Sequence, residues 1–204
     1  NCIELLNLNN YDIIVEPSAG SGSFLRHLPK DKTVAFDIEP ESENITKCNW
    51  FDINRLLSNG LVIGNPPFGK RNALSKQFIQ HAIKLNAKTI AFILPNVYHK
   101  HTLQSVFPKE YRLIKTYELP KDSFTINGEC FNLPCTFFVW DRSEGEDLRC
   151  DPNKYSTNDF EFVSKNKATD NDFFILGASP NTTKEVCDVN ENNRGYYIRP
   201  KDKC

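Results

Sequence analysis

The tetrapeptide Asn65-Pro66-Pro67-Phe68 follows directly on the apolar run at residues 61–64. A short apolar run ended by two prolines predicts a buried strand that stops at a rigid turn, because proline fixes φ and has no backbone N–H. The turn leaves the carbonyl oxygens of Asn65 and Pro66 as free acceptors beside the ring of Phe68. Such a corner suits a planar ring that carries an exocyclic amino group. The alternative is a strand-ending turn without a ligand.

A second motif follows the short buried strand predicted at residues 12–15. Glu16 ends this strand, and Gly20 and Gly22 lie in the turn before a predicted helix at residues 22–28. Glycines here allow a tight turn and a close approach of a ligand to the backbone. The third glycine of the dinucleotide-binding fingerprint is missing, and a carboxylate would repel a pyrophosphate. We expect a cofactor that brings a cation or hydroxyl groups; a role in backbone packing alone is the alternative.

Carboxylates also follow the next two predicted strands. The run at residues 33–37 ends in Asp37, at a position where an acidic side chain typically binds ribose hydroxyls. Asp52 follows a weaker strand at residues 49–51 and would accept a hydrogen bond from an adenine amine. Both aspartates have a second interpretation, since Asp is also common at the start of a helix.

Strand and helix patterns alternate along the first part of the chain, which predicts a mostly parallel α/β sheet. Apolar residues at helical spacing predict a helix at residues 74–85. The almost wholly apolar run at residues 89–94 predicts a central strand. A shorter helix is predicted at residues 103–107.

The composition changes at Glu144, after which Asp, Asn, Lys and Ser dominate. We therefore divide the chain into an α/β domain at residues 1–143, which carries both motifs, and a small β-containing appendage at residues 144–204. Apolar runs predict strands at residues 173–176 and 195–198, and the segment at residues 177–193 is loop-like.

Composition limits the classes of function. The 204 residues are 39% hydrophobic and 25% charged, as is usual for a soluble protein, and no apolar run could span a membrane. Seven cysteines without a Cys-x-x-Cys pair indicate reduced thiols in a cytoplasmic protein and no metal site. The net charge of −1 means that any nucleic acid would be bound by a local patch. Because methionine is absent, we expect the sequence to be part of a longer product.

With both motifs present in this order, the sequence resembles S-adenosylmethionine-dependent adenine-N6 methyltransferases that act on nucleic acid. The resemblance covers about residues 10–142 and is closest to the small stand-alone enzymes of bacteria, phages and large DNA viruses. It implies a Rossmann-like class I methyltransferase sheet that ends in an antiparallel pair of strands at residues 113–119 and 135–140. The N-terminal helix that often covers the methionine part of the cofactor would be only partly present, at residues 2–8.

The resemblance assigns roles to individual residues. The catalytic residues would be Asn65, Pro66, Pro67 and Phe68. The residues that bind S-adenosylmethionine would be Glu16, Pro17, Ser18, Ala19, Gly20, Gly22, Asp37, Ile38, Asp52 and Asn65.

We expect methyl transfer to N6 of an adenine in DNA, flipped out of the duplex and stacked on Phe68. The alternatives are an RNA adenine, a glutamine of a release factor, and a noncatalytic nucleic-acid-binding subunit of the same fold. The glutamine enzymes carry Asn-Pro-Pro-Tyr, whereas this chain has Phe68 at the last position.

Nucleic-acid contacts are expected along the same rim. Lys70 and Arg71 come directly after the catalytic corner, and Tyr98 and Lys100 follow the central strand. Lysine and arginine would contact phosphates and Tyr98 would stack on a base; the alternative is a solvated loop.

Too few residues separate the glycine turn from Asn65 to hold a target-recognition domain. Recognition must therefore come from the appendage, from loops or from a specificity or nuclease partner. Four phenylalanines are assigned to the core, namely Phe24, Phe124, Phe131 and Phe137.

Overall fold

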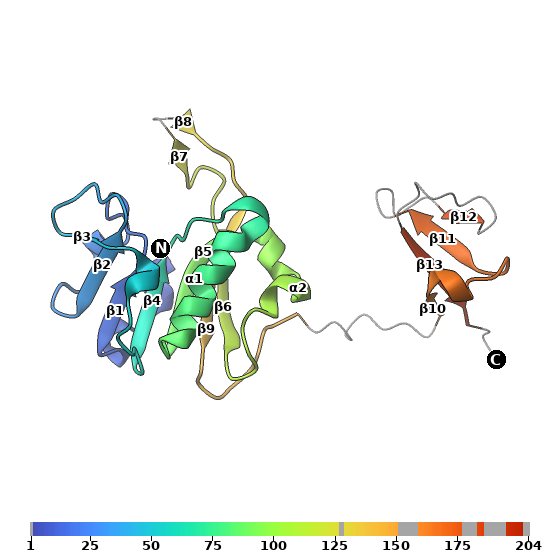
Figure 1. Ribbon diagram of the computed structural model, residues 1–204, viewed down its shortest axis with the longest axis horizontal. Helices are drawn as coiled ribbons and strands as arrows, with labels where there is room; N and C mark the ends of the chain where they lie inside the picture. The colour runs from blue at the N-terminus through green and yellow to red at the C-terminus, as the bar shows by residue number, and fades with distance from the viewer. Residues whose placement is uncertain (1, 127–128, 151–158, 177–182, 186–194, 202–204) are drawn as a thin grey trace. The chain divides into compact units, whose positions relative to one another are not determined.

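The computed structural model describes residues 2–126, 129–150, 159–176, 183–185 and 195–201. The chain forms two compact units, residues 1–151 and 152–204 (Figure 1). The boundary predicted after residue 143 lies earlier than this division. Residues beyond it still bond to the first unit: the Leu148 amide donates to the carbonyl of Leu113, and the Arg149 guanidinium to that of Phe107. Within the described ranges, no helix combines the length and the apolar character needed to cross a membrane.

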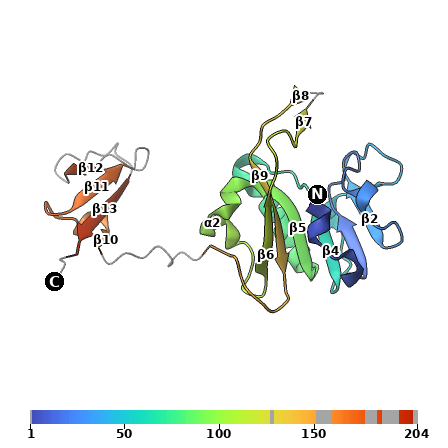
Figure 2. The same cartoon turned by 180° about the vertical axis from the view of Figure 1, so that it is seen from behind.

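The first unit is built on a seven-stranded sheet in the order β3-β2-β1-β4-β5-β9-β6. Its strands are β1 Ile13–Glu16, β2 Thr33–Asp37, β3 Thr46–Lys47, β4 Gly60–Gly64, β5 Thr89–Pro95, β6 Arg112–Glu118 and β9 Cys135–Asp141. In this sheet order, neighbouring strands from β3 through β2, β1 and β4 to β5 are parallel. Strand β9 is antiparallel to both of its neighbours, β5 and β6. This order confirms the predicted class I methyltransferase sheet with a reversed last strand (Figures 1 and 2).

Both faces of the sheet are buried, which explains why its central strands are nearly continuous apolar runs. Every residue of β4 and of β9 is buried. On one face, Phe78 and Ile79 of α1 (Ala73–Lys84) pack into a cluster with strand residues such as Val62. The short 3-10 helices η1 (Cys2–Leu5) and η2 (Leu8–Asn10) pack against part of the other face.

The helix predicted at residues 74–85 is therefore confirmed, but two shorter ones are not. The segment at residues 22–28 is a turn followed by the 3-10 helix η3 (Leu25–His27). The helix predicted at residues 103–107 begins and ends earlier, as α2 (His101–Gln104). The remaining 3-10 helices of this unit are η4 Trp50–Asp52, η5 Lys70–Asn72 and η6 Asn96–His99.

The strand predicted at residues 49–51 is wrong. The Asn49 side chain accepts a hydrogen bond from the Phe51 amide at 3.1 Å and so caps η4. An asparagine that bonds its own nearby backbone favours a helix start over a strand. The third strand in sequence is instead the two-residue β3, which lies before Asn49.

A two-stranded hairpin lies in the connection between β6 and β9. It consists of β7 (Thr125–Ile126) and β8 (Glu129–Cys130). The hairpin projects beyond the edge of the sheet, at the same end as the start of α1 (Figure 1). The sequence patterns did not predict it.

The second unit is an antiparallel sheet in the order β10-β13-β11-β12. Its strands are β10 Phe160–Val163, β11 Phe173–Leu176, β12 Thr183–Glu185 and β13 Gly195–Pro200, and the 3-10 helix η7 spans Lys165–Lys167. The strands predicted at residues 173–176 and 195–198 are confirmed. The segment predicted as a loop contains β12, and its other parts lie outside the described residues.

Candidate active site

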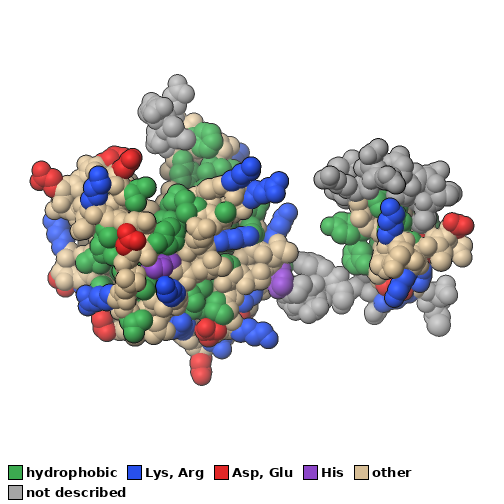
Figure 3. Space-filling model, viewed as in Figure 1, with side chains coloured by type: hydrophobic (Ala, Val, Ile, Leu, Met, Phe, Trp, Pro, Cys, Tyr) green, Lys and Arg blue, Asp and Glu red, His purple; other side chains and the backbone are tan. Residues whose placement is uncertain are grey.

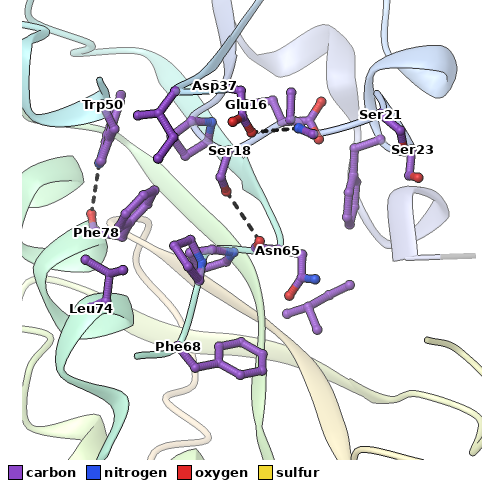
Figure 4. A pocket seen from close by; sticks show the side chains of 18 of the residues that line it. Glu16, Ser18, Ser21, Ser23, Asp37, Trp50, Asn65, Phe68, Leu74 and Phe78 are labelled. Carbon is purple, nitrogen blue, oxygen red and sulfur yellow. Dashed lines mark hydrogen bonds between the residues drawn. The ribbon is translucent and has the colours of Figure 1, made fainter. Parts of the chain in front are cut away.

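The two sequence motifs meet at one edge of the sheet. Because β1, β2 and β4 are adjacent and parallel, their carboxyl ends lie side by side. Glu16 and Asp37 are the last residues of their strands, and Asn65 directly follows β4. A cavity of about 1080 Å³ opens at this edge and is lined by residues of both motifs (Figure 4). Open α/β sheets bind ligands at this edge.

Hydrogen bonds join the segments that form this rim. The Ser18 hydroxyl donates to the backbone carbonyl of Asn65 at 3.3 Å, which links the glycine turn to the Asn65–Phe68 corner (Figure 4). The Gly20 amide donates to Asp37 Oδ2 at 2.7 Å, and the Glu39 amide donates to Asp37 Oδ1 at 2.9 Å. Three separate stretches of sequence are thus held as one wall.

Gly20 is required by its backbone conformation and not by packing. Its φ is +51°, in the left-handed region that favours glycine. A Cβ atom built at Gly20 would meet nothing within 4 Å. The packing alternative therefore does not explain this glycine. Gly22 also has a positive φ, +81°, and shapes the turn, but it does not line the cavity.

Glu16 is a buried acid in the cavity wall. Its side chain is 2% exposed, and Oε2 has no hydrogen-bond partner among the described residues. Burial raises the pKa of Glu16 to about 8, and the nearby charge of Asp37 also raises the pKa. A backbone hydrogen bond at Leu25 acts in the opposite direction and lowers it. A carboxyl group in a cavity wall, with one buried oxygen that has no hydrogen-bond partner among the described residues, can pair with a cationic group. The sulfonium and ammonium groups of S-adenosylmethionine are such cations. The carboxyl groups in the cavity wall therefore fit the cofactor that the sequence resemblance implies.

Asp37 is half-buried at the end of β2 and keeps acceptor capacity. Each carboxylate oxygen has a second lone pair beyond the one used by a backbone amide, so Asp37 can still accept from a hydroxyl. Ile38, which follows it, is 63% exposed and lines the cavity. A carboxylate followed by an exposed apolar side chain can bind a ribose and lie against an attached ring.

Most of the predicted cofactor residues line the cavity, and Asp52 does not. The lining residues from that set are Glu16, Pro17, Ser18, Ala19, Gly20, Asp37, Ile38 and Asn65. Asp52 is exposed on η4, because the segment turns into a helix before reaching it. Its neighbours Asn49, Trp50 and Phe51 line the cavity instead, and the Trp50 indole donates to the Phe78 carbonyl at 3.4 Å (Figure 4).

The corner formed by Asn65–Phe68 is fixed to the start of α1. The Phe68 carbonyl accepts the amides of Leu74 and Ser75 at 3.2 and 3.3 Å. Pro66 is buried, whereas Asn65 is exposed and Phe68 is half-buried. All four residues of the tetrapeptide line the cavity.

The apolar end of the cavity includes residues that sequence reasoning missed. Leu119, Ser123 and Phe124, in the connection between β6 and β9, form part of its wall. No local pattern marks them, because they lie more than fifty residues from the tetrapeptide. Phe24 and Phe124 pack against the core as predicted and also line the cavity.

Two other aromatic assignments are corrected or confirmed by burial. Phe137 is fully buried, as predicted, whereas Phe131 is 48% exposed and so is not a core residue.

The expected base-stacking role of Tyr98 is wrong. Its ring is 1% exposed, and its hydroxyl lies 2.8 Å from the hydroxyl of Ser75.

The cationic side chains expected to contact nucleic acid are at the surface. Lys70, Arg71 and Lys100 are all exposed. Figure 3 shows several lysine and arginine side chains gathered over the start of α1 and beside α2. Phosphate contact therefore stays a prediction for these three residues.

Residues 7–146 match the family model of the EDM2 methyltransferase-like domain. Two similar solved structures are a proposed RNA methyltransferase from Pyrococcus horikoshii and a proposed methyltransferase from Thermoplasma acidophilum. The first has a TM-score of 0.47 and 12% identity, covering 65% of this chain and 76% of that one. The second has a TM-score of 0.41 and 14% identity, covering 69% and 72%.

No curated protein matches the chain in sequence. The family match spans more than half of the chain and includes both motifs of the cavity rim. The chain belongs to the EDM2 methyltransferase-like domain family.

Proposed function

We propose that this protein transfers a methyl group from S-adenosylmethionine to N6 of an adenine in DNA. The observation that carries the proposal is the shared cavity, in which the glycine turn after β1 and the Asn65–Phe68 corner after β4 form one wall. A methyltransferase needs a donor and an acceptor in line within one site, and orientation of this kind supplies a large part of the rate. The cavity's volume of about 1080 Å³ suits two ligands bound together.

The methyl donor would occupy the polar half of the cavity, which is lined by Glu16, the glycine turn and Asp37. Glu16 would face a positive charge of the cofactor, and Asp37 would accept hydrogen bonds from ribose hydroxyls. When bound, S-adenosylmethionine supplies an electrophilic methyl group on a positively charged sulfur. The same carboxylates repel phosphates, which favours placing the nucleic acid's backbone outside this half.

The acceptor base would occupy the apolar half of the cavity, which includes Phe68, Leu119 and Phe124. Phe68 and Phe124 come from different parts of the chain and offer aromatic faces in the same cavity. Aromatic side chains that stack on a base stabilise it by about 1–3 kcal/mol. A base within a duplex could not reach this cavity, so the adenine would be flipped out of the helix.

Asn65 would orient the reacting nitrogen. The lone pair of an adenine amine is delocalised into the ring, which makes N6 a poor nucleophile. Acceptors at the Asn65 side chain and the Pro66 carbonyl would bind the two N–H groups and favour a more tetrahedral nitrogen. N6 held by these acceptors would form its bond to the methyl carbon as the carbon–sulfur bond breaks, and the amine would release a proton to solvent.

Exposed cations would hold the backbone of the substrate at the mouth of the cavity. Lys70 and Arg71 directly follow the catalytic corner, and Lys100 follows β5 on the same edge. With a net charge of −1, the protein would depend on such a local patch, and its affinity would fall with added salt.

The decisive experiment supplies labelled S-adenosylmethionine with DNA, RNA or a release factor as methyl acceptor. We expect label in DNA, and N6-methyladenine after digestion of the product to nucleosides. Label only in RNA or only in the release factor would identify the acceptor as one of those two. A protein that binds nucleic acid but labels no acceptor would be a noncatalytic subunit.

A further inference from the structure

The hairpin between β6 and β9 links the cavity to the surface through a pair of aromatic residues. Thr125 pairs with Cys130, and the ladder continues by one step because the Phe131 amide donates to the Phe124 carbonyl at 2.9 Å. Residues directly opposite each other in an antiparallel pair place their side chains on the same face. Phe124 and Phe131 therefore share one face of the hairpin.

The two rings differ in their surroundings. Phe124 is half-buried, packs against the core and lines the cavity. Phe131 is 48% exposed and is not among the residues that line the cavity. An exposed apolar ring outside a ligand cavity, on an element that projects from the sheet edge, is free to contact a substrate bound at that cavity (Figure 1).

A flipped base leaves a gap in the duplex beside the enzyme's cavity. Proteins that distort duplexes commonly insert apolar side chains between base steps, because the inserted ring replaces part of the lost stacking. A side chain in this role must be exposed and held next to the mouth of the base cavity. Phe131 meets both conditions through its exposure and its backbone bond to Phe124.

We propose that Phe131 is a positioning residue that enters the gap left by the flipped adenine, which makes a duplex the preferred substrate. The inference rests on the proposed function and adds the form of the nucleic acid to it. Lys70 and Arg71, exposed beside the same cavity, would hold the phosphates while the ring is inserted. On a single strand there is no base-pair gap to fill, so Phe131 would have little effect.

The test measures methylation of one adenine-containing DNA strand, either annealed to its complement or alone, by the wild type, Phe131→Ala and Phe131→Trp. We expect Phe131→Ala to lower kcat/KM on the duplex by about tenfold or more and on the single strand by less than about twofold. Phe131→Trp should keep most of the duplex activity. Tyr117→Ala is a matched control, because it removes a 38% exposed aromatic ring from the same unit, on β6.

A second measurement does not depend on turnover. A duplex with 2-aminopurine at the target position becomes more fluorescent when that base leaves the stack. We expect the wild type to increase this signal and Phe131→Ala to increase it less, at protein concentrations that saturate binding. Equal losses on duplex and single strand, or no loss on either, would overturn the role of Phe131 while leaving the proposed function intact. A wild type that methylates neither DNA form would count against both.

Discussion

The polar and apolar halves of the cavity differ in how the chain builds them. The polar half comes from one continuous stretch around β1 and its turn, closed by Asp37 of the adjacent β2. The apolar half combines Phe24, at the end of that turn, with Phe68 and Phe124 from two distant segments. A charged or hydroxylated ligand needs donors and acceptors at fixed backbone positions, which a local turn can supply. A planar ring needs extended apolar surface, which only packing of several segments provides.

Asn65 lies where the two halves meet, so its removal tests whether they act together. We expect Asn65→Ala to lower kcat by about a thousandfold, because it removes an acceptor that acts on the reacting nitrogen. Cofactor affinity, measured by calorimetry, should stay nearly unchanged. A fall in cofactor affinity as large as the fall in kcat would contradict the separation of roles.

Glu16 tests the polar half alone. We expect Glu16→Gln to weaken binding of S-adenosylmethionine on the order of a hundredfold, because it removes the negative charge that faces the cation. Affinity for nucleic acid should change little. Calorimetry with each ligand checks both statements, and equal losses for the two ligands would remove the distinction between the halves.

The same residue also carries a dependence on pH. Its pKa is raised from an ordinary value of 4.5 to about 8, so between these values the folded protein retains a proton that the unfolded chain loses. The free energy of unfolding of the ligand-free protein should therefore fall as pH rises from 4.5 to about 8. Glu16→Gln should remove that fall and raise the melting temperature at pH 8 by several degrees.

Cofactor binding should be linked to the same proton. A bound cation favours the Glu16 carboxylate, so at pH 7 binding should release a proton into the buffer. Calorimetry in buffers of different ionisation enthalpy measures this release in the wild type, and Glu16→Gln should show less of it. Identical proton release in both proteins would place the cation elsewhere.

Phe124 tests the apolar half. We expect Phe124→Ala to lower kcat/KM for nucleic acid by about tenfold, because one stacking surface is lost. Phe124→Leu keeps an apolar side chain without an aromatic face and should not restore activity, whereas Phe124→Tyr should. Recovery with leucine would show that the residue serves only packing. The affinity for S-adenosylmethionine is the internal control.

The smallest effect is expected for the hydrogen bond that links the two motifs. Ser18 is half-buried, and its bond to the Asn65 carbonyl is 3.3 Å long. We expect Ser18→Ala to reduce kcat/KM by at most about fivefold, since a single neutral hydrogen bond contributes about 1 kcal/mol. Ser21→Ala, at a neighbouring serine that lines the cavity, is the matched control. A loss as large as that of Asn65→Ala would show that Ser18 fixes the catalytic corner.

The sequence predicted the parts of the fold that depend on local patterns. The parallel strands, α1 and the two motifs at the sheet edge follow from apolar runs, helical spacing and the positions of glycine and proline. Predictions failed where a local pattern had a competing local solution. Asn49 capped a 3-10 helix where a strand was expected, and this left Asp52 outside the cavity.

Burial was harder to predict than secondary structure. Tyr98 follows a central strand and was expected at the surface, but its hydroxyl bonds Ser75 of α1 and its ring is buried. Phe131 was expected in the core and is exposed on a hairpin that no pattern indicated. Burial of Tyr98 depends on a contact with a residue 23 positions away in the chain, which no local pattern records.

By itself, the sequence determined the chemistry available at the carboxyl ends of β1, β2 and β4: two carboxylates, an amide, two prolines and an aromatic ring. It also determined that these ends lie on one edge, because short apolar runs joined by crossovers form parallel strands. Only the tertiary structure decided which distant aromatic rings complete the cavity and which acid in its wall keeps one oxygen without a partner among the described residues. Burial and pairing depend on contacts between segments far apart in sequence, and no local pattern records those contacts.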